Sequence, residues 1–170
     1  MTFEETLNLV KRIPYGRNTN RDDFSLVISE NKGTCSSKHA YLKQFANDNN
    51  VPNVRLFIGL YKMTEQNTNI SNILSRNNLE YLPEAHCYLK IDNEIVDVTT
   101  INSDFGRIRD SLMEEIEIEP WQVGDFKVDY HKSFIFKWIN LNNVKFSFEE
   151  IWRIREECIS YLSNKIELSQ

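Results

Sequence analysis

Apolar positions near the start of the chain recur with the spacing of one helix face. Leu7 and Val10 lie three residues apart within 3–11. Thr2 and Glu5 form a capping box, in which a hydroxyl and a carboxylate satisfy each other's backbone N–H groups. The pattern predicts a short amphipathic helix over 3–11, ended by the proline that follows.

A second apolar pattern, from Cys35 to about Ala46, covers much of a helix circumference instead of a single stripe. Its apolar members are Ala40, Tyr41, Leu42, Phe45 and Ala46. Thr34 stands in the N-cap position, where a hydroxyl can accept from an unpaired N–H group of the first turn. We therefore expect a buried helix that begins at Cys35.

Runs of β-branched and aromatic residues predict the strands. One strand is expected over Val54–Met63, and two more are expected at 126–130 and 134–141. The acidic run 114–119 is interpreted as a solvated strand or a helix end. A closing helix is expected over 148–164, because the serine before it and a glutamate three residues later make a second capping box.

The segment 86–99 predicts a β-hairpin whose register follows from its hydrophobic pattern. A two-residue turn at Asp92-Asn93 makes one side mostly apolar. The facing pairs are Ile91–Glu94, Leu89–Val96 and Cys87–Val98 on that side, and Lys90–Ile95, Tyr88–Asp97 and His86–Thr99 on the other. His86 and Asp97 then become diagonal neighbours, with Cβ atoms about 7–8 Å apart. A one-residue slip would separate them and break the apolar side, so both considerations favour one register.

Composition limits the class of protein. A single domain over 1–170, with a core at about 24–141 and a helix on each flank, fits a chain that is 41% hydrophobic. The net charge of −5, with no basic face, argues against nucleic-acid binding. No apolar run approaches the ~18–20 residues of a membrane span. Three cysteines without an export signal favour the cytoplasm, and the oligomeric state is left open.

Cys35 occupies a position where a cysteine becomes nucleophilic. Thiolates are stabilised at helix N-termini and beside an imidazolium. The N–H groups of the same helix turn can also donate to an oxyanion that develops at an attacked carbonyl. Gly33, two residues earlier, would let a substrate backbone approach closely.

The predicted hairpin supplies the remaining catalytic groups. Cys35 would attack an acyl carbon, while His86 would remove the thiol proton and later protonate the leaving group. Asp97 would fix the tautomer and orientation of His86. Cys35, His86 and Asp97 are therefore the candidate catalytic residues, and this chemistry needs no cofactor and no metal.

The order of these motifs resembles the transglutaminase-like core, a papain-type arrangement of microbial transglutaminase-domain proteins and peptide N-glycanases. The matching motifs are Gly33-Thr-Cys35, Ala85-His86 and Asp97-Val-Thr99, and the run from Pro14 to His39 resembles small bacterial members of that superfamily. The resemblance implies an α+β fold with a helix packed on an antiparallel sheet and a cleft where the two meet. One buried helix followed by successive strands independently favours the α+β class.

The chain departs from that pattern around the oxyanion site. Ser36 stands where animal transglutaminases usually have Trp, and the upstream Gln of papain-type peptidases is absent, with Asn31 the nearest amide. The residues expected to assist as oxyanion donors or supporting groups are Asn31, Thr34, Ser36, His39 and Tyr88.

His39 is the rival to His86, since it lies four residues after Cys35 on the same helix face. We interpret it as a structural or supporting residue, because no carboxylate is placed to orient it. A zinc site at Cys35, His39 and His86 is disfavoured, because paired ligand spacings are missing. The residues interpreted as structural are Cys87 and Cys158 in the core, Trp121, Trp138 and Trp152 mainly in the core, and His131 at the surface or in a turn.

The expected reaction is acyl transfer through a thioester, either amide hydrolysis or transfer of a glutamyl-type acyl group to an amine. The substrate would be a peptide, a protein or a small amide. Hydrolysis is favoured over cross-linking, because 170 residues leave little room for the accessory domains of animal transglutaminases. An arylamine N-acetyltransferase has similar chemistry, but it has Asp-Val-Gly where this chain has Asp97-Val-Thr-Thr. A catalytically silent peptide-binding module of the same fold is the alternative from another class.

Overall fold

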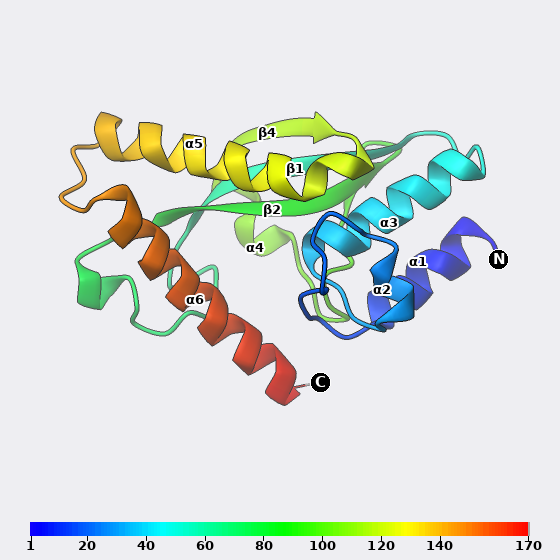
Figure 1. The fold of residues 1–170 in the computed structure, drawn as a ribbon, viewed down its shortest axis with the longest axis horizontal. Helices are drawn as coiled ribbons and strands as arrows, with labels where there is room; N and C mark the ends of the chain where they lie inside the picture. The colour runs from blue at the N-terminus through cyan, green and yellow to red at the C-terminus, as the bar shows by residue number, and fades with distance from the viewer. Residues whose placement is uncertain (170) are drawn as a thin grey trace.

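Three helices precede the sheet in the computed structural model, which describes residues 1–169 (Figure 1). They are α1 (Phe3–Arg12), α2 (Leu26–Ser29) and α3 (Cys35–Asp48). The predicted caps are confirmed, because the Thr2 and Thr34 hydroxyls accept from N–H groups of the first turns of α1 and α3. In the capping box of α3, Ser37 takes the place of the usual Glu or Gln and accepts from the Thr34 N–H.

The sheet has four strands in the order β3-β2-β1-β4, and every neighbouring pair is antiparallel. The strands are β1 (Val54–Met63), β2 (Leu82–Ile91), β3 (Glu94–Val96) and β4 (Leu112–Ile118). Three short elements lie in the connections: η1 (Ser75–Asn77), α4 (Gly106–Arg109) and η2 (Pro120–Val123). Helices on an antiparallel sheet confirm the α+β class.

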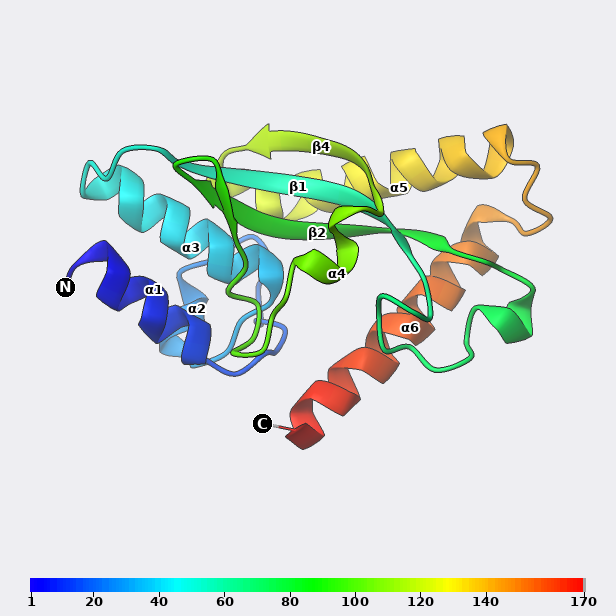
Figure 2. The ribbon, with the colours of Figure 1, turned by 180° about the vertical axis from the view of Figure 1, so that it is seen from behind.

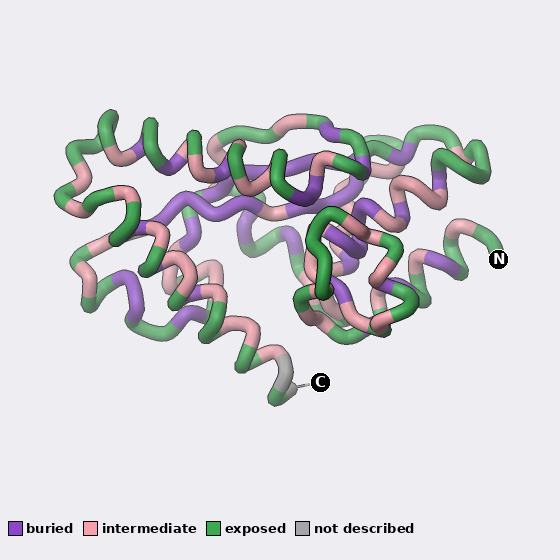
Figure 3. The backbone as a smooth tube through the Cα atoms, in the orientation of Figure 1, coloured by how far each residue is buried: buried purple, intermediate pink, exposed green. Residues whose placement is uncertain are grey.

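Each face of the sheet contributes to a separate apolar cluster, because alternate side chains of a strand point in opposite directions. Leu56 and Ile58 pack with α3, and α5 crosses the sheet on that same side (Figure 1). Phe57 and Tyr61 belong to the other cluster, which includes residues of α4 and of the loop that follows β1. Figure 2 shows α4 on the side of the sheet opposite α5. The buried backbone in Figure 3 accordingly runs along β1 and β2.

The hairpin forms with the predicted turn and register, but it is shorter than expected. Leu89 pairs with Val96, and Asp92 and Asn93 have φ angles of 49° and 70°, as a type I′ turn requires. The ladder between β2 and β3 ends at Val96, so Asp97 follows the strand instead of lying within it. The side chain of Asp97 is held by His86 of β2 and by Thr99 of the loop.

The two strands predicted at 126–130 and 134–141 are wrong, because both fall within the helix α5 (Asp125–Leu141). The buried residues of α5 are His131, Ile135 and Trp138, at the i, i+4, i+7 spacing of one helix face. The aromatic content resembled that of a strand, but this spacing carried the correct signal. His131, predicted at the surface, is 3% exposed and bonds the Pro83 carbonyl at 2.8 Å.

The acidic run 114–119 instead forms most of the edge strand β4. In β4, Ile116 and Ile118 point toward the core while Glu115 and Glu117 alternate with them. The interpretation as a solvated strand is therefore the correct one of the two offered. Trp121, which follows this strand, is 68% exposed, so its assignment to the core is wrong.

The closing helix α6 (Phe148–Ser169) begins as predicted, with Ser147 and Glu150 in a reciprocal capping box. Its first half packs on the second apolar cluster, and the rest runs diagonally past the sheet toward the side of the N-terminal helices (Figure 1). The buried pair Glu84–Arg155 ties α6 to β2. In the described part of the chain, no helix is long and apolar enough to cross a membrane.

Candidate active site

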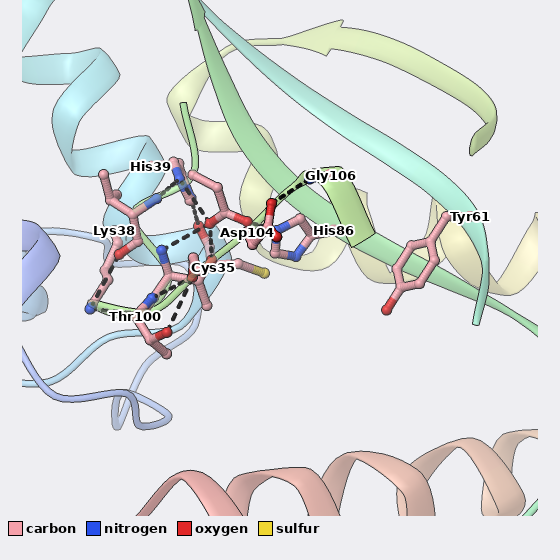
Figure 4. Close-up of polar contacts among 12 residues, drawn as sticks. Cys35, Lys38, His39, Tyr61, His86, Thr100, Asp104 and Gly106 are labelled. Atoms are coloured by element: carbon pink, nitrogen blue, oxygen red, sulfur yellow. Dashed lines mark hydrogen bonds and ion pairs between the residues drawn. The ribbon is translucent and has the colours of Figure 1, made fainter. Parts of the chain in front are cut away.

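The nucleophile candidate Cys35 is the first residue of α3, and its sulfur points toward His86 on β2 (Figure 4). The Ser36 hydroxyl lies 3.9 Å from this sulfur, and the Lys127 ammonium lies 3.7 Å from it. Cys35 itself is half-buried and lines a cavity. The start of α3 leaves the thiol open to the cavity, and strand β2 places a histidine beside it.

His86 and Asp97 form a short hydrogen bond across the end of the hairpin. His86 Nε2 lies 2.7 Å from Asp97 Oδ2, and the other carboxylate oxygen accepts from the N–H and hydroxyl of Thr99 at 2.9 and 2.6 Å. Because Asp97 engages Nε2, Nδ1 is the ring nitrogen left to serve the thiol. The structure thus brings Cys35, His86 and Asp97 together, and His86 and Asp97 are neighbours as predicted although the ladder ends before Asp97.

Charge stabilisation at this cluster favours a thiolate beside an imidazolium. A hydrogen bond from Cys87 lowers the pKa of the Cys35 thiol well below its usual value, with Lys127 and His86 adding to the effect against the cost of burial. Burial alone would lower the pKa of His86, but the charges of Asp97 and Cys35 outweigh it and raise that pKa to about 10. Both shifts favour the nucleophilic form of Cys35 at neutral pH.

His39 supports the site through hydrogen bonds to backbone groups and does not line the cavity. Its Nε2 accepts from the Val98 N–H at 2.9 Å, so the proton lies on Nδ1, which donates to the Cys35 carbonyl at 2.7 Å. Asp97 Oδ1 is 3.7 Å from Nε2, so a carboxylate does lie nearby, contrary to the expectation. Backbone groups nevertheless orient the ring, and burial lowers the pKa of His39. These contacts agree with its interpretation as a supporting residue.

A buried lysine, Lys38, holds the loop that carries Asp97. Its ammonium donates to the carbonyls of Ile13, Val98 and Thr99, the last at 2.9 Å. Burial lowers the pKa of Lys38 to about 8, against the opposing charge of Asp97. Sequence reasoning missed this residue, because a lysine inside an apolar helix is ordinarily expected at the surface.

Gly33 has a packing role instead of the substrate-binding role that we expected. A Cβ at Gly33 would lie 2.9 Å from Lys38 Cγ and 3.1 Å from Val27 Cγ2. Gly33 is buried, and its backbone exchanges hydrogen bonds with the chain at Pro14 and Gly16. Its lack of a side chain therefore makes room for the buried lysine.

The other supporting candidates divide into those near the thiol and those away from it. Ser36 contacts the Cys35 sulfur, and Thr34 caps α3 beside it. Tyr88 packs against the His86 ring, with centroids 6.4 Å apart. Its hydroxyl, however, donates to Glu115 of β4 and not toward the thiol. Asn31 is exposed and does not line the cavity that contains Cys35, so its assignment as an oxyanion donor is wrong.

Cys87 is fully buried, as expected, but it lies beside the reactive cysteine. The sulfurs of Cys87 and Cys35 approach the same Ser36 hydroxyl, at 3.7 and 3.9 Å. Burial, followed by the hydrogen bond to Cys35, raises the pKa of Cys87 well above its usual value. Cys87 therefore remains a thiol and can donate to a thiolate at Cys35.

Two polar groups beside the site were missed because they come from the C-terminal part of the chain. Lys127 on α5 donates to Ser36 Oγ at 2.8 Å. Arg155 on α6 makes two bonds of 2.8 Å to the Glu84 carboxylate, and Arg155 lowers the pKa of Glu84 to about 2 even though burial opposes this. The helical spacing of the buried residues of α5 was the only sequence signal that could have predicted that Lys127 lies beside the sheet.

These groups line a cavity of about 850 Å³ between the start of α3, the ends of β1 and β2, and helices α5 and α6. Tyr61 and Trp152 contribute aromatic surface to its walls. No group of three or more His, Cys, Asp or Glu side chains within residues 1–169 is arranged to hold a metal ion. The expected cleft between helix and sheet is thus present, and α6 closes its far side.

Comparison with protein-family models, curated proteins and solved structures gives no match for this chain.

Proposed function

We propose that the protein is a thiol-dependent acyl-transfer enzyme that works through a thioester at Cys35. The observation that supports this most directly is the 2.7 Å bond between His86 Nε2 and Asp97 Oδ2, which leaves Nδ1 for the thiol. The start of α3 adds N–H groups that can stabilise a thiolate and an oxyanion. The resemblance to the transglutaminase-like core leads to the same proposal.

In the first half-reaction the Cys35 thiolate forms a bond to the acyl carbon, and the carbonyl π electrons move to the oxygen. The carbonyl then re-forms, the C–N bond breaks, and the leaving amine takes the proton from His86 Nδ1. In the second half-reaction His86 Nδ1 removes a proton from water or an amine, whose oxygen or nitrogen forms a bond to the acyl carbon. The C–S bond then breaks, so the acyl group leaves as an acid or an amide and the Cys35 thiolate beside a protonated His86 is restored. Asp97 keeps the His86 ring oriented throughout and stabilises it whenever it is the imidazolium.

The proposed substrates are a peptide, a protein side chain or a small amide. A cavity of about 850 Å³ falls within the usual size of a small-molecule site, about 300–1,000 Å³. Its mixed lining of aromatic and charged side chains suits an amide with polar substituents. We favour hydrolysis over cross-linking as the net reaction.

Acyl capture provides the test. The wild-type protein is mixed with p-nitrophenyl acetate, and we expect a burst of p-nitrophenol together with an acetyl group on the peptide that contains Cys35. The Cys35→Ala variant should give no burst, whereas the Cys158→Ala variant, which lacks a buried cysteine of α6, should behave as the wild type. Stopped-flow absorbance and peptide mass spectrometry measure the two outcomes.

Iodoacetamide labelling separates an enzyme from a silent binding module. We expect Cys35 to be alkylated at nearly its full rate at pH 6, because its thiolate is stabilised. Alkylation that follows an ordinary thiol pKa near ~8.5, or the absence of an acyl burst, would contradict the proposal.

A further inference from the structure

Helix α5 delivers a cation to the reacting sulfur. Lys127 Nζ lies 3.7 Å from Cys35 Sγ and 2.8 Å from Ser36 Oγ. Among the described residues no carboxylate lies within 4.0 Å of it, because the nearby acid Glu84 already uses both oxygens on Arg155. The ammonium therefore faces the nucleophile without an ion-pair partner of its own.

The remaining hydrogen-bonding capacity of Lys127 is directed toward the same position. An ammonium has three N–H donors and no acceptor. One donor serves the Ser36 hydroxyl and a second faces the sulfur, which leaves one for a bound group. Lys127 also lines the cavity beside Cys35 and His86.

We propose that Lys127 is a catalytic residue of acyl transfer at Cys35, where its ammonium donates to the oxyanion of the tetrahedral intermediate. The proposal rests on the proposed function and adds the donor for which Asn31 was wrongly expected. Attack by sulfur forms the S–C bond and moves the carbonyl π electrons onto oxygen, so the negative charge moves from Sγ to that oxygen. A cation already within 3.7 Å of Sγ stays close to the charge during this transfer.

The charge state of Lys127 suits this role. Burial lowers its pKa, but the negative charge of Cys35 outweighs burial and raises the pKa above that of an ordinary lysine. Lys127 is therefore charged at the pH at which Cys35 reacts. Cys35, Lys127, His86 and Asp97 together carry two positive and two negative charges, so the resting site is neutral.

The start of α5 is fixed against the loop before α2, which determines where Lys127 lies. The Asp125 N–H donates to Asp22 Oδ1 at 3.0 Å, across a sequence separation of 103 residues. A Cβ at Gly124 would lie only 1.6 Å from that same oxygen, so the contact requires glycine. Lys127 follows within the first turn of the helix.

Two reagents separate oxyanion stabilisation from thiolate stabilisation. p-Nitrophenyl acetate acylates Cys35 through a tetrahedral oxyanion, whereas iodoacetamide alkylates it by displacement and forms none. The rate with each reagent is measured as a function of pH. Each rate is then divided by the fraction of Cys35 that is thiolate at that pH. The variants are Lys127→Met, Lys127→Arg and, as the matched control, Lys137→Met, which removes an exposed lysine of the same helix.

We expect Lys127→Met to lower acylation per thiolate about a hundredfold, while alkylation per thiolate is nearly unchanged. Lys127→Arg should retain most of the acylation rate, and Lys137→Met should match the wild type. Equal losses with both reagents, or no loss in acylation, would overturn the role of Lys127. If Lys127→Met fails to fold, as judged by circular dichroism, Lys127→Gln, which is polar but uncharged, replaces it and should show the same selective loss of acylation.

The two proposals fail in different ways. If the wild-type protein gives no acyl burst, the proposed function is wrong. If the wild type reacts and Lys127→Met acylates equally fast per thiolate, only the role of Lys127 is wrong.

Discussion

Two histidines lie beside the same carboxylate, yet their surroundings give them opposite charge states. His86 Nε2 is 2.7 Å from Asp97 Oδ2, and this charge together with that of Cys35 raises the pKa of His86 to about 10. His39 Nε2 is 3.7 Å from Asp97 Oδ1, and it accepts the Val98 N–H instead. Burial then lowers the pKa of His39.

The difference teaches that proximity to a carboxylate does not make a histidine a base. His39 has both nitrogens engaged by backbone groups, so it has no position left for the thiol proton. His86 uses one nitrogen for Asp97, which leaves the other for the proposed reaction. The hydrogen bonds made by the two ring nitrogens therefore distinguish His86, the candidate base, from His39, the supporting residue.

Replacing each histidine by glutamine in turn tests this difference and has the largest expected effect on the reaction of Cys35. We expect His86→Gln to lower acylation of Cys35 by p-nitrophenyl acetate about a thousandfold at pH 7, because the base and its positive charge are lost. His39→Gln should keep the rate within about tenfold, since a glutamine oxygen can still accept from Val98. Equal losses in the two variants, each confirmed as folded, would remove the distinction.

Replacing the shared carboxylate has the next largest effect. In Asp97→Asn the amide retains an acceptor for Thr99 but loses the charge that holds His86 protonated. We expect acylation of Cys35 to fall about a hundredfold and its pH profile to move to higher pH. Labelling with iodoacetamide across pH 5–9 measures the shift, and an unmoved profile would mean that Asp97 only shapes the loop.

The pH dependence of stability gives the smallest but most specific test. A raised folded pKa, as for His86, stabilises the fold below the unfolded value near ~6.5, and that contribution is lost as pH rises toward about 10. A lowered folded pKa, as for His39, stabilises above that unfolded value and is lost as pH falls below it. The two histidines should therefore give opposite slopes.

Urea unfolding in a Cys35→Ala background measures these slopes, because the lowered pKa of the thiol would otherwise add the opposite slope to that of His86. Without the charge of Cys35 the upper limit for His86 lies below 10. His86→Gln should flatten the alkaline limb and His39→Gln the limb below about pH 6.5. If His86→Gln leaves the alkaline limb unchanged, the raised pKa is wrong.

Local sequence determined the parts of the site that depend on short-range pattern. The N-cap Thr34 places Cys35 at a helix start, and the Asp92-Asn93 turn sets a register that brings His86 and Asp97 together. Both are consequences of backbone geometry within a few residues. They could be derived without knowing what packs around them.

Only the tertiary structure decided the groups that arrive from distant segments. Lys127 reaches Cys35 across a sequence separation of 92 residues, and the helix that carries it has the aromatic content of a strand. The buried Lys38 likewise depends on carbonyls of two separate loops. Charge states were also decided at this level, because desolvation and neighbouring charges exist only after packing. Short-range pattern thus indicated the candidate nucleophile and the candidate base, while packing determined their electrostatic surroundings.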